Sequence, residues 1–406
     1  MMAMEKNNKT LNVPNLRFPE FCGEWERDTL QSVATLLKGT GISKDQLSEE
    51  GQSCILYGEL YTKYRSEIID TIISKTDIDP KRLVRSQTND VIIPCSGESA
   101  VDIATARCVK QSDVLLGGDL NIIRLKGEHD GSFFAYQLNG KRKYDIAKVA
   151  QGVSVVHLYG EHLKGVKVNY PSAAEQKKIS SLLALIDQRI ETQKKIIEEY
   201  ESLIKGIVET QYSQCHSIKQ VRISEIGKPF TTMNMSKEDL SEEGNECILY
   251  GELFTIYGCV IKEVKSRTQI TTDKATISQR NDLLFPASTT VDAISLIAPT
   301  AICKKGVILG GDMFGIHINE NYNNEYLSYL INYIYKSKLA RYAQGSTIIH
   351  LHYSDIKNVT LMIPSIEEQN RLAKLMRIVE EKHEVEKHLL SKHYRQKACL
   401  LSNLFI

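Results

Sequence analysis

The stretch SKDQLSEEGQSCILYGELYTKY at residues 43–64 returns as SKEDLSEEGNECILYGELFTIY at residues 236–257, with sixteen of 22 positions identical at a shift of 193. The same shift joins further blocks: LGGD at 116–119 with 309–312, and AQGVSVVHL at 150–158 with AQGSTIIHL at 343–351. One offset held across separate blocks is the signature of an internal repeat. The chain is therefore a tandem duplication.

The register slips at one place inside the repeat. NDVIIP at 89–94 matches NDLLFP at a shift of 192, whereas Val101-Asp102 matches Val291-Asp292 at a shift of 190. CSGESA at 95–100 therefore stands against the shorter ASTT at 287–290. Insertions are tolerated in surface loops, where binding residues also concentrate. Neutral drift in a loop and a role in binding both remain open for this segment.

Each half opens with short apolar runs separated by turn residues, a pattern typical of strands. These runs are CILYGEL, DVIIP, VLLGGD and NIIRL, at 54–60, 90–94, 114–119 and 121–125. A helical stretch follows, which in the second half covers residues 324–345 with Gly345 at the C-cap position. A last strand at 166–171 or 359–364 closes an α+β domain in each half.

A capping box then predicts the start of a long helix in each half, because Pro-Ser-x-x-Glu occurs at 171–175 and at 364–368. Apolar residues alternate at spacings of three and four, which indicates a coiled-coil seam. The seam positions are Ile179, Leu183, Ile186, Ile190, Ile197 and Ile204 in the first helix, and Leu372, Met376, Val379, Leu390 and Leu400 in the second. The second seam also contains His383, Glu386, His393 and Lys397, so we expect polar layers in it.

These patterns predict an α+β protein: a tandem pseudo-two-fold repeat of two α+β domains, separated by two long helices that pair as an antiparallel coiled coil. The expected boundaries are a disordered N-terminal tail at 1–19, a first domain at 20–171, a central helix at 172–216, a second domain at 217–364 and a C-terminal helix at 365–406.

Composition excludes more than it identifies. The chain has 406 residues and a formal charge of +1, which does not by itself indicate nucleic-acid binding. Its nine cysteines contain no CxxC pair, so we expect reduced thiols in the cytoplasm and no zinc site. No apolar run is long enough to cross a membrane. No phosphate loop or methyltransferase tetrad of the Asn/Asp-Pro-Pro-aromatic type is present, so we expect no catalysis, cofactor or metal.

Two similar domains at the ends of a rigid strut would hold two similar partners at a set distance. A DNA duplex with two half-sites fits this geometry. A two-headed scaffold that brings two partner enzymes together without binding DNA fits it as well.

Three segments resemble the specificity subunits of type I restriction–modification systems: LRFPEFCGEW at 16–25, and the two junctions at 150–179 and 343–372 that end in EQKKI and EEQNRL. The resemblance implies a non-catalytic subunit in which each domain is a target-recognition domain that reads one half of a bipartite DNA site. It also implies that the helices dock two modification (methyltransferase) subunits, through which restriction subunits join the complex.

The candidate DNA-binding residues come from the tyrosine block, the variable loop, a basic run and the Gln-Gly junctions. They are Tyr57, Lys63, Tyr64, Arg65, Ser96, Glu98, Lys141, Arg142, Lys143 and Gln151 in the first half, and Tyr250, Thr255, Tyr257, Ser288, Thr289, Thr290, Gln344 and Thr347 in the second. Identity between the copies favours a framework role for the tyrosine block. Lys63 against Ile256 and Arg65 against Gly258 suit discrimination better. Gln151 and Gln344 could equally bind phosphate or cap the end of a domain.

Overall fold

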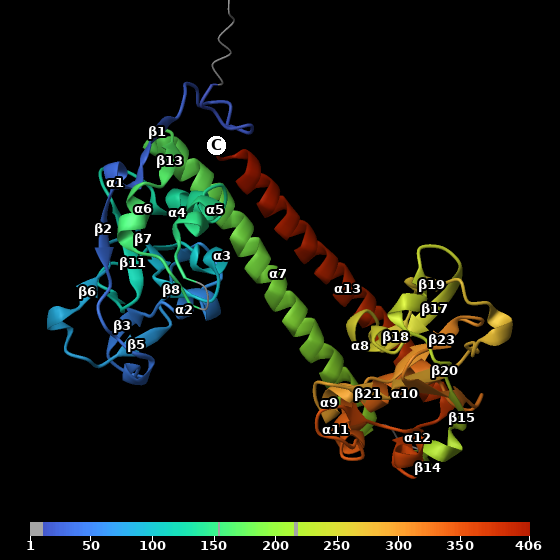
Figure 1. Cartoon of the computed structure of the whole chain (residues 1–406). Coiled ribbons are helices and arrows are strands. Elements are labelled where there is room, and N and C mark those ends of the chain that lie inside the picture. The colour runs from blue at the N-terminus through green and yellow to red at the C-terminus, as the bar shows by residue number, and fades with distance from the viewer. Residues whose placement is uncertain (1–10, 153–154, 215–217) are drawn as a thin grey trace, which may run out of the picture. The chain divides into compact units, whose positions relative to one another are not determined.

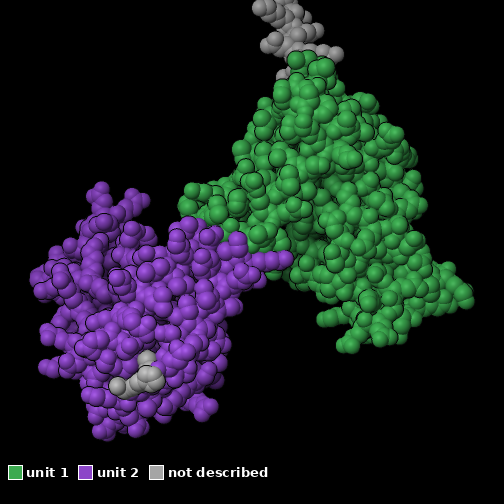
Figure 2. All heavy atoms as spheres, turned by 180° about the vertical axis from the view of Figure 1, so that it is seen from behind, with its two compact units in different colours: residues 1–194, 388–406 green, residues 195–387 purple. Residues whose placement is uncertain are grey.

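The computed structural model describes residues 11–152, 155–214 and 218–406. The chain divides into two compact units, coloured separately in Figure 2: residues 1–194 with 388–406, and residues 195–387. Each unit contains one α+β domain and a segment of each of two long helices, α7 (Ala173–Gln214) and α13 (Ile366–Asn403) (Figure 1). The predicted fold class, two α+β domains with two long helices, is confirmed.

The first domain is built around a five-stranded sheet whose central strands are the apolar runs DVIIP and NIIRL. In sheet order its strands are β2 (Ala34–Lys38), β11 (Leu120–Leu125), β7 (Asp90–Pro94), β9 (Arg107–Val109) and β4 (Ile68–Ile69). Val91 and Ile93 of β7 join one apolar core, while Ile92 between them joins another. Strand β7 is buried on both faces, which explains why its sequence is continuously apolar rather than alternating.

A smaller four-stranded sheet packs beside the first. Its strands, in sheet order, are β5 (Ser74–Thr76), β3 (Gln52–Ile55), β10 (Leu115–Leu116) and β6 (Val84–Arg85). The run CILYGEL was predicted to be one strand, and this is wrong beyond Ile55. Glu59 instead begins the helical turn α2 (Glu59–Thr62), because its carboxylate accepts the backbone N–H of Leu56 at 2.9 Å and so closes a turn.

Two-stranded ribbons and short helices complete the first domain. The ribbons pair β1 (Glu26–Thr29) with β13 (Lys167–Tyr170), and β8 (Ser96–Gly97) with β12 (Val156–His157). The helices are α1 (Leu30–Val33), α3 (Ala100–Ile103), α4 (Gly131–Asn139), α5 (Lys143–Val149) and α6 (Gly160–Lys164). Helix α4 is buried along its length and covers the five-stranded sheet through Phe133, Phe134 and Tyr136.

The second domain repeats this plan, except that its four-stranded sheet has an extra strand beside the counterpart of β5 instead of one beside the counterpart of β10. Its five-stranded sheet has the order β15 (Gly227–Thr231), β24 (Met313–Ile318), β20 (Asp282–Pro286), β22 (Thr300–Ile302) and β18 (Val260–Ile261). Its four-stranded sheet has the order β16 (Leu240–Ser241), β19 (Ser266–Thr268), β17 (Asn245–Leu249) and β23 (Ile308–Gly310). The ribbons pair β14 (Lys219–Arg222) with β26 (Thr360–Ile363), and β21 (Ser288–Thr289) with β25 (Ile349–His350). The short helices are α8 (Glu252–Thr255), α9 (Ala293–Leu296) and α12 (Tyr353–Ile356).

The helical stretch predicted at 324–345 is divided into three parts. Helix α10 (Asn324–Leu330) leads through one π-helical segment (Ile331–Tyr335) into α11 (Lys336–Ala340). Helix α11 ends at Ala340 with Arg341 as its C-cap, so the prediction that Gly345 caps it is wrong. Gly345 has a φ of +122° and lies in the turn before β25, where an added Cβ would meet the carbonyl oxygen of Ile348.

Half of the predicted capping box forms at each long helix. Ser172 accepts the N–H of Glu175 at 3.5 Å, and Ser365 accepts that of Glu368 at 3.4 Å. The carboxylate of Glu175 does not complete the box, because it binds Arg17 at 2.7 Å. The next residue is the one that ties helix to domain: Gln176 donates to the carbonyl of Pro171, and its oxygen accepts the N–H of Asp130.

Segments of α7 and α13 run antiparallel within each unit. In the first unit, Lys397 pairs with Asp187 at 2.6 Å, and Lys194 lies over the ring of Tyr394. In the second unit, His383 lies 3.6 Å from Glu201, and Arg371 donates to Gln211. Of the predicted seam positions, Ile179, Leu183, Ile186, Ile190, Ile204, Leu372 and Met376 are buried, and Ile197, Val379, Leu390 and Leu400 are half-buried.

Residues 11–19, which the sequence placed in a disordered tail, are bound to the first unit. The N–H of Leu16 donates to the carbonyl of Asn403, and Phe18 packs against the main core. The buried carboxylate of Glu175 holds Arg17 in place, which is a contact that composition alone does not reveal. Residues 1–10 of the predicted tail lie outside the described residues.

Candidate nucleic-acid interface

The repeated tyrosine block forms the same hydrogen-bonded turn in both units. Thr62 and Thr255 each donate to the carbonyl four residues earlier, at 3.0 Å. The hydroxyl of Tyr64 accepts the N–H of Ile73 at 3.1 Å, and that of Tyr257 accepts the N–H of Lys265 at 3.0 Å. Burial raises the pKa of Tyr64 to about 12. The polar atoms of these residues serve the framework, as their identity between copies suggested.

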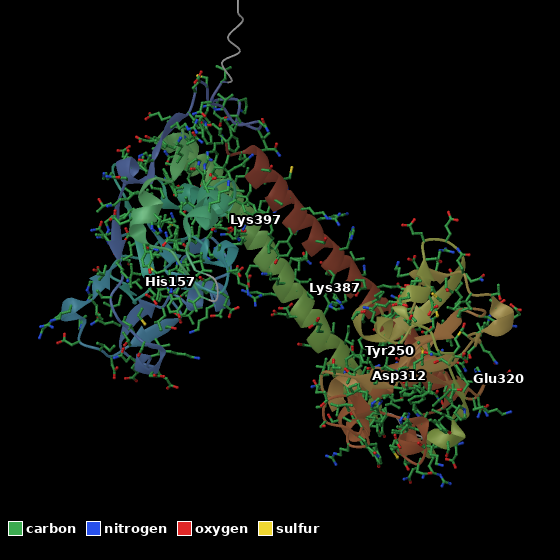
Figure 3. The ribbon with its side chains drawn as sticks, in the orientation of Figure 1. His157, Tyr250, Asp312, Glu320, Lys387 and Lys397 are labelled. Atoms are coloured by element: carbon green, nitrogen blue, oxygen red, sulfur yellow. The ribbon has the colours of Figure 1, made fainter. Side chains whose placement is uncertain are left out.

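The first tyrosine of each block is placed differently. Tyr57 is 38% exposed and Tyr250 is 37% exposed, and neither hydroxyl has a hydrogen-bond partner among the described residues. Figure 3 marks Tyr250 on the turn before α8. An exposed ring with a free hydroxyl offers both a stacking face and a hydrogen bond to a ligand. Tyr57 and Tyr250 are therefore the members of the block that are free to contact DNA.

Two candidates that differ between the copies have different surroundings. Lys63 is held by the carboxylate of Glu59 at 2.7 Å and by Ser74 at 2.8 Å, which leaves it little freedom to contact a ligand. Arg65 is exposed and makes no ion pair within the part of the chain that the structure describes.

The structure brings the variable loop beside the Gln-Gly junction in each unit. Ser96 of β8 stands opposite His157 of β12, and Ser288 of β21 stands opposite His350 of β25. The junction glutamines add a backbone bridge to the same histidines, from Gln151 to His157 and from Gln344 to His350. Candidates about 60 residues apart in sequence thus share one edge of each domain. Ser154, a further phosphate candidate in this junction, lies outside the described residues.

The structure corrects the register of this loop. Ser99 caps α3 by accepting the N–H of Asp102, and Asp292 caps α9 by accepting that of Ser295. The equivalent residues are therefore Ser99 and Asp292, at the usual shift of 193, and the matching letters at Val101-Asp102 and Val291-Asp292 are coincidental. The second copy has one residue more before the helix, rather than two fewer.

The three basic residues at 141–143 of the first unit have different roles, because only one of their side chains forms hydrogen bonds or ion pairs within the described residues. Arg142 binds the carbonyl of Ile406 at 2.9 Å and Asp145 at 3.1 Å, so it holds the end of the chain. Lys141 is exposed, and Lys143 begins α5. The position equivalent to Lys143 is Lys336, the first residue of α11. Lys336 was not among the predicted residues, although the constant shift of 193 from Lys143 points to it.

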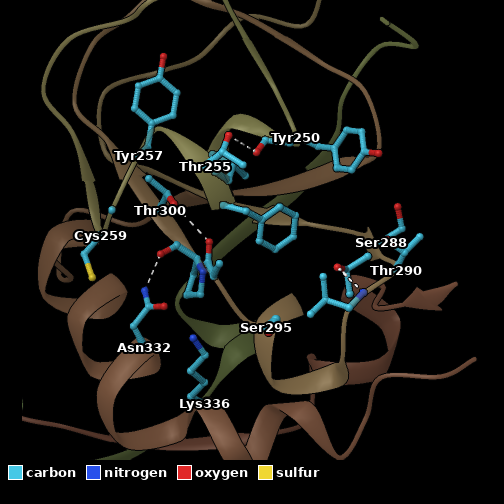
Figure 4. Close-up of a pocket in the computed structure, with 18 of the residues that line it drawn as sticks. Tyr250, Thr255, Tyr257, Cys259, Ser288, Thr290, Ser295, Thr300, Asn332 and Lys336 are labelled. Carbon is cyan, nitrogen blue, oxygen red and sulfur yellow. Dashed lines mark hydrogen bonds between the residues drawn. The ribbon is translucent and has the colours of Figure 1, made fainter. Parts of the chain in front are cut away.

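Six of the second-half candidates surround one cavity in the second unit, with a volume of about 830 Å³ (Figure 4). They are Tyr250, Thr255, Tyr257, Ser288, Thr289 and Thr290. In Figure 4, Lys336 points into the hollow from the helical side, and Thr255 and Tyr250 lie on the opposite wall. Gln344 and Thr347 are exposed nearby but do not line the cavity.

In the first unit the same two segments touch directly. The hydroxyl of Tyr61 donates to the carbonyl of Ser96 at 3.1 Å, which joins α2 to β8. Tyr57, on the turn before α2, and Glu98, just beyond β8, are both exposed. Each domain therefore presents its tyrosine turn, variable loop and junction together.

The described residues contain no group of three or more His, Cys, Asp or Glu side chains placed to hold a metal ion. Among the same residues, no helix is both long and apolar enough to cross a membrane.

Comparison with known proteins identifies this arrangement. The family model "Type I restriction modification DNA specificity domain" matches twice, at residues 23–202 and 207–392. A putative type I restriction enzyme MjaX specificity subunit from Methanocaldococcus jannaschii is 23% identical over 303 residues, covering 68% of each chain.

Two solved structures share the fold. The S subunit of a type I restriction–modification system from M. genitalium matches with a TM-score of 0.63 and 17% identity, covering 97% of this chain and 99% of that one. A chain from a study of complex assembly and conformational transition of the type I R-M system matches with a TM-score of 0.56 and 12% identity, covering 94% and 97%.

Two tandem domains of this kind, together with the two long helices, define a DNA sequence-specificity subunit. The chain belongs to the family of type I restriction–modification specificity subunits. Such a subunit selects the DNA sequence for a restriction–modification complex and is not itself catalytic. The resemblance predicted from the sequence is confirmed, and the scaffold that does not bind DNA is not favoured.

Proposed function

We propose that the domain at 20–171 reads one half of a bipartite double-stranded DNA target and that the domain at 217–364 reads the other. The observation that carries this proposal is the repetition of one surface in both units. In each, the tyrosine turn, the variable loop and the Gln-Gly junction lie at one edge of the domain. Half-site readers that share a framework and differ at a few exposed positions suit a target with two different halves.

The freedom of each side chain divides the candidates into contacts and supports. Tyr64, Tyr257, Thr255 and Lys63 use their polar atoms inside the domain and would shape the surface. The proposed DNA contacts are exposed, half-buried or cavity-lining residues: Tyr57, Arg65, Ser96, Glu98, Lys141, Lys143 and Gln151 in the first domain, and Tyr250, Ser288, Thr289, Thr290, Lys336, Gln344 and Thr347 in the second. Lysines would bind phosphate, and the loop residues would face base edges.

The helical regions at 172–216 and 365–406 would dock two modification subunits and set the spacing between half-sites. Restriction subunits would join through the assembled complex, in the cytoplasm. Exposed apolar side chains along both helices support a docking role, including Leu185 at 57% exposed and Val385 at 62% exposed.

A domain exchange tests the assignment. Residues 43–149 replace 236–342 in the full chain. The transplanted copy also carries Glu67→Cys, because Cys259 holds the equivalent place in the second unit and packs in an apolar cluster with Ile204. Sequencing the methylated positions in a host that carries the complex should show the first half-site twice, at an unchanged spacing. A second half-site that stays as in the wild type, or a changed spacer, would contradict the proposed division of labour.

A further inference from the structure

The cavity of the second unit has a composition that suits one kind of ligand. Among the described residues that line it are the aromatic rings of Tyr250, Phe254, Tyr257 and Tyr333, several hydroxyl groups, the amide of Asn332 and the ammonium of Lys336, but no carboxylate. Its volume of about 830 Å³ falls within the range of small-molecule sites. An aromatic, hydroxyl-rich hollow with one cation favours a ligand that has a ring and a negative charge.

Four polar groups of the lining have no partner among the described residues. The Oδ1 atom of Asn332 is free because its amide nitrogen makes the bonds, to Pro299 at 2.8 Å and to Ser328 at 3.0 Å. The hydroxyls of Ser288 and Thr290 make no hydrogen bond within the described residues, and Lys336 makes no ion pair there. These groups face the hollow from two segments of the chain, 288–290 and 332–336 (Figure 4). They offer acceptors, donors and one positive charge that no hydrogen bond or ion pair of the described residues occupies.

The first unit fills the equivalent space with a side chain. Arg107 begins β9 just as Thr300 begins β22. The guanidinium of Arg107 is buried and donates to the carbonyls of Tyr64 at 3.1 Å and Ala106 at 3.0 Å. The equivalents of those two residues, Tyr257 and Pro299, line the cavity of the second unit. Thr300 is too short to reach across, and its hydroxyl donates to its neighbour Ala298 at 3.2 Å.

We propose that this cavity binds a single nucleotide, with the base between the aromatic side chains and the phosphate at Lys336. Asn332, Ser288 and Thr290 would bind the edge of the base. The inference rests on the proposed function where the nucleotide belongs to the second half-site and leaves the base stack; a free mononucleotide has the same chemistry. Enclosing a displaced base between aromatic and polar side chains is a known mode of recognition. The first domain would lack this pocket because Arg107 occupies it.

The test uses the full chain with its modification subunits on duplexes that carry the bipartite target. 2-Aminopurine, whose fluorescence rises when it leaves the stack, replaces each base of the second half-site in turn. One position should brighten with the wild type. Thr300→Arg, which fills the cavity as Arg107 does, should reduce the affinity for the nucleotide about tenfold, the value of one base–aromatic stack. Lys336→Gln, which removes the contact to the phosphate, should reduce the affinity by a similar factor. Lys338→Gln is the matched control, because Lys338 donates to Thr360 and does not line the cavity.

A second arm titrates the four free deoxynucleoside monophosphates by calorimetry without DNA. Binding that both variants weaken, with no brightening on DNA, would support the pocket and make a free nucleotide its ligand. Absence of both signals, or variants that behave as wild type while circular dichroism shows them folded, would overturn the proposal.

Gel shifts on the same duplexes distinguish a failure of the nucleotide pocket from a failure of the proposed function. Specific binding without a pocket effect contradicts only the pocket, whereas loss of specific binding by the wild type contradicts the proposed function.

Discussion

At the scale of single residues, an equivalent half-buried carboxylate, Asp187 in the first unit and Glu380 in the second, has different partners in the two units. Tyr136 donates to Asp187 at 2.8 Å, and the equivalent Tyr329 donates to Glu380 at 2.8 Å. Asp187 also binds Lys397, whereas Glu380 makes no ion pair within the described residues. Burial raises the pKa of Glu380 above its usual range. The second unit therefore carries a half-buried carboxylate whose charged form is disfavoured by its surroundings.

We predict that Glu380→Gln stabilises the second unit at neutral pH by about 1 kcal/mol, because glutamine still accepts from Tyr329 and removes the buried charge. A pKa raised by folding means that the folded wild type binds the proton more tightly. The stability that the proton on Glu380 contributes should therefore fall as the pH rises from about 4.3, the pKa of glutamate in the unfolded chain, through the higher pKa of Glu380 in the folded protein. Thermal unfolding between pH 4 and pH 8 should show the variant's advantage growing with pH. A variant less stable than wild type at pH 7 would contradict this account.

At the scale of elements, a charge cluster ties the C-terminal helix to the first domain. Lys397 of α13 (Figure 3) binds Asp187 of α7 at 2.6 Å and Glu67, next to β4, at 2.5 Å. Burial would lower the pKa of Lys397, but the two carboxylates outweigh it and raise that pKa. In the second unit Ile204 and Cys259 stand in the places of Lys397 and Glu67, inside an apolar cluster with Tyr329. The two helix–domain junctions are therefore chemically different.

Lys397→Ile should destabilise the first unit by about 3 kcal/mol, because it removes the ion-pair partner of Asp187 and Glu67 and leaves only the charge of Arg107 near both carboxylates. Adding Glu67→Cys reproduces the arrangement of the second unit and should restore most of the loss. Hydrogen exchange of residues 388–403 should be fast in the single variant and slow again in the double one. If the double variant exchanges as fast as the single, charge pairing is not what holds this helix.

At the scale of the whole molecule, α7 and α13 each pass from one unit to the other. The division between the units falls after Lys194 in α7 and after Lys387 in α13. Each domain packs against its own portion of both helices. The contacts are Leu183 of α7 and Leu400 of α13 in the first unit, and Tyr212 of α7 and Leu372 of α13 in the second. The domains would then determine which bases are read, and the helices would determine the spacing between the two half-sites.

Inserting seven residues at each of these two points keeps the heptad phase of both helices and lengthens them by about 10 Å. The preferred spacer of the DNA target should increase by about three base pairs, at 3.4 Å per base pair, while both half-sites stay the same. Sequencing the methylated sites reads both properties at once. A seven-residue insertion at the exposed Gly127 is the matched control and should leave the spacer unchanged. A change in the bases read after the helix insertion would contradict the separation.

The sequence by itself determined the duplication, the two long helices and the family, because each depends on local patterns repeated along the chain. Buried strands such as DVIIP and the serine caps at Ser172 and Ser365 belong to this class. Only the tertiary structure decided which polar residues remain free. Tyr64 and Lys63 look like ligand-binding residues in the sequence. In the fold, however, the hydroxyl of Tyr64 accepts a backbone N–H, and the ammonium of Lys63 pairs with the carboxylate of Glu59. Asn332 became a candidate only because folding placed it in the lining of a cavity. Hydrogen-bond partners distant in sequence decide such roles, and no local pattern records them.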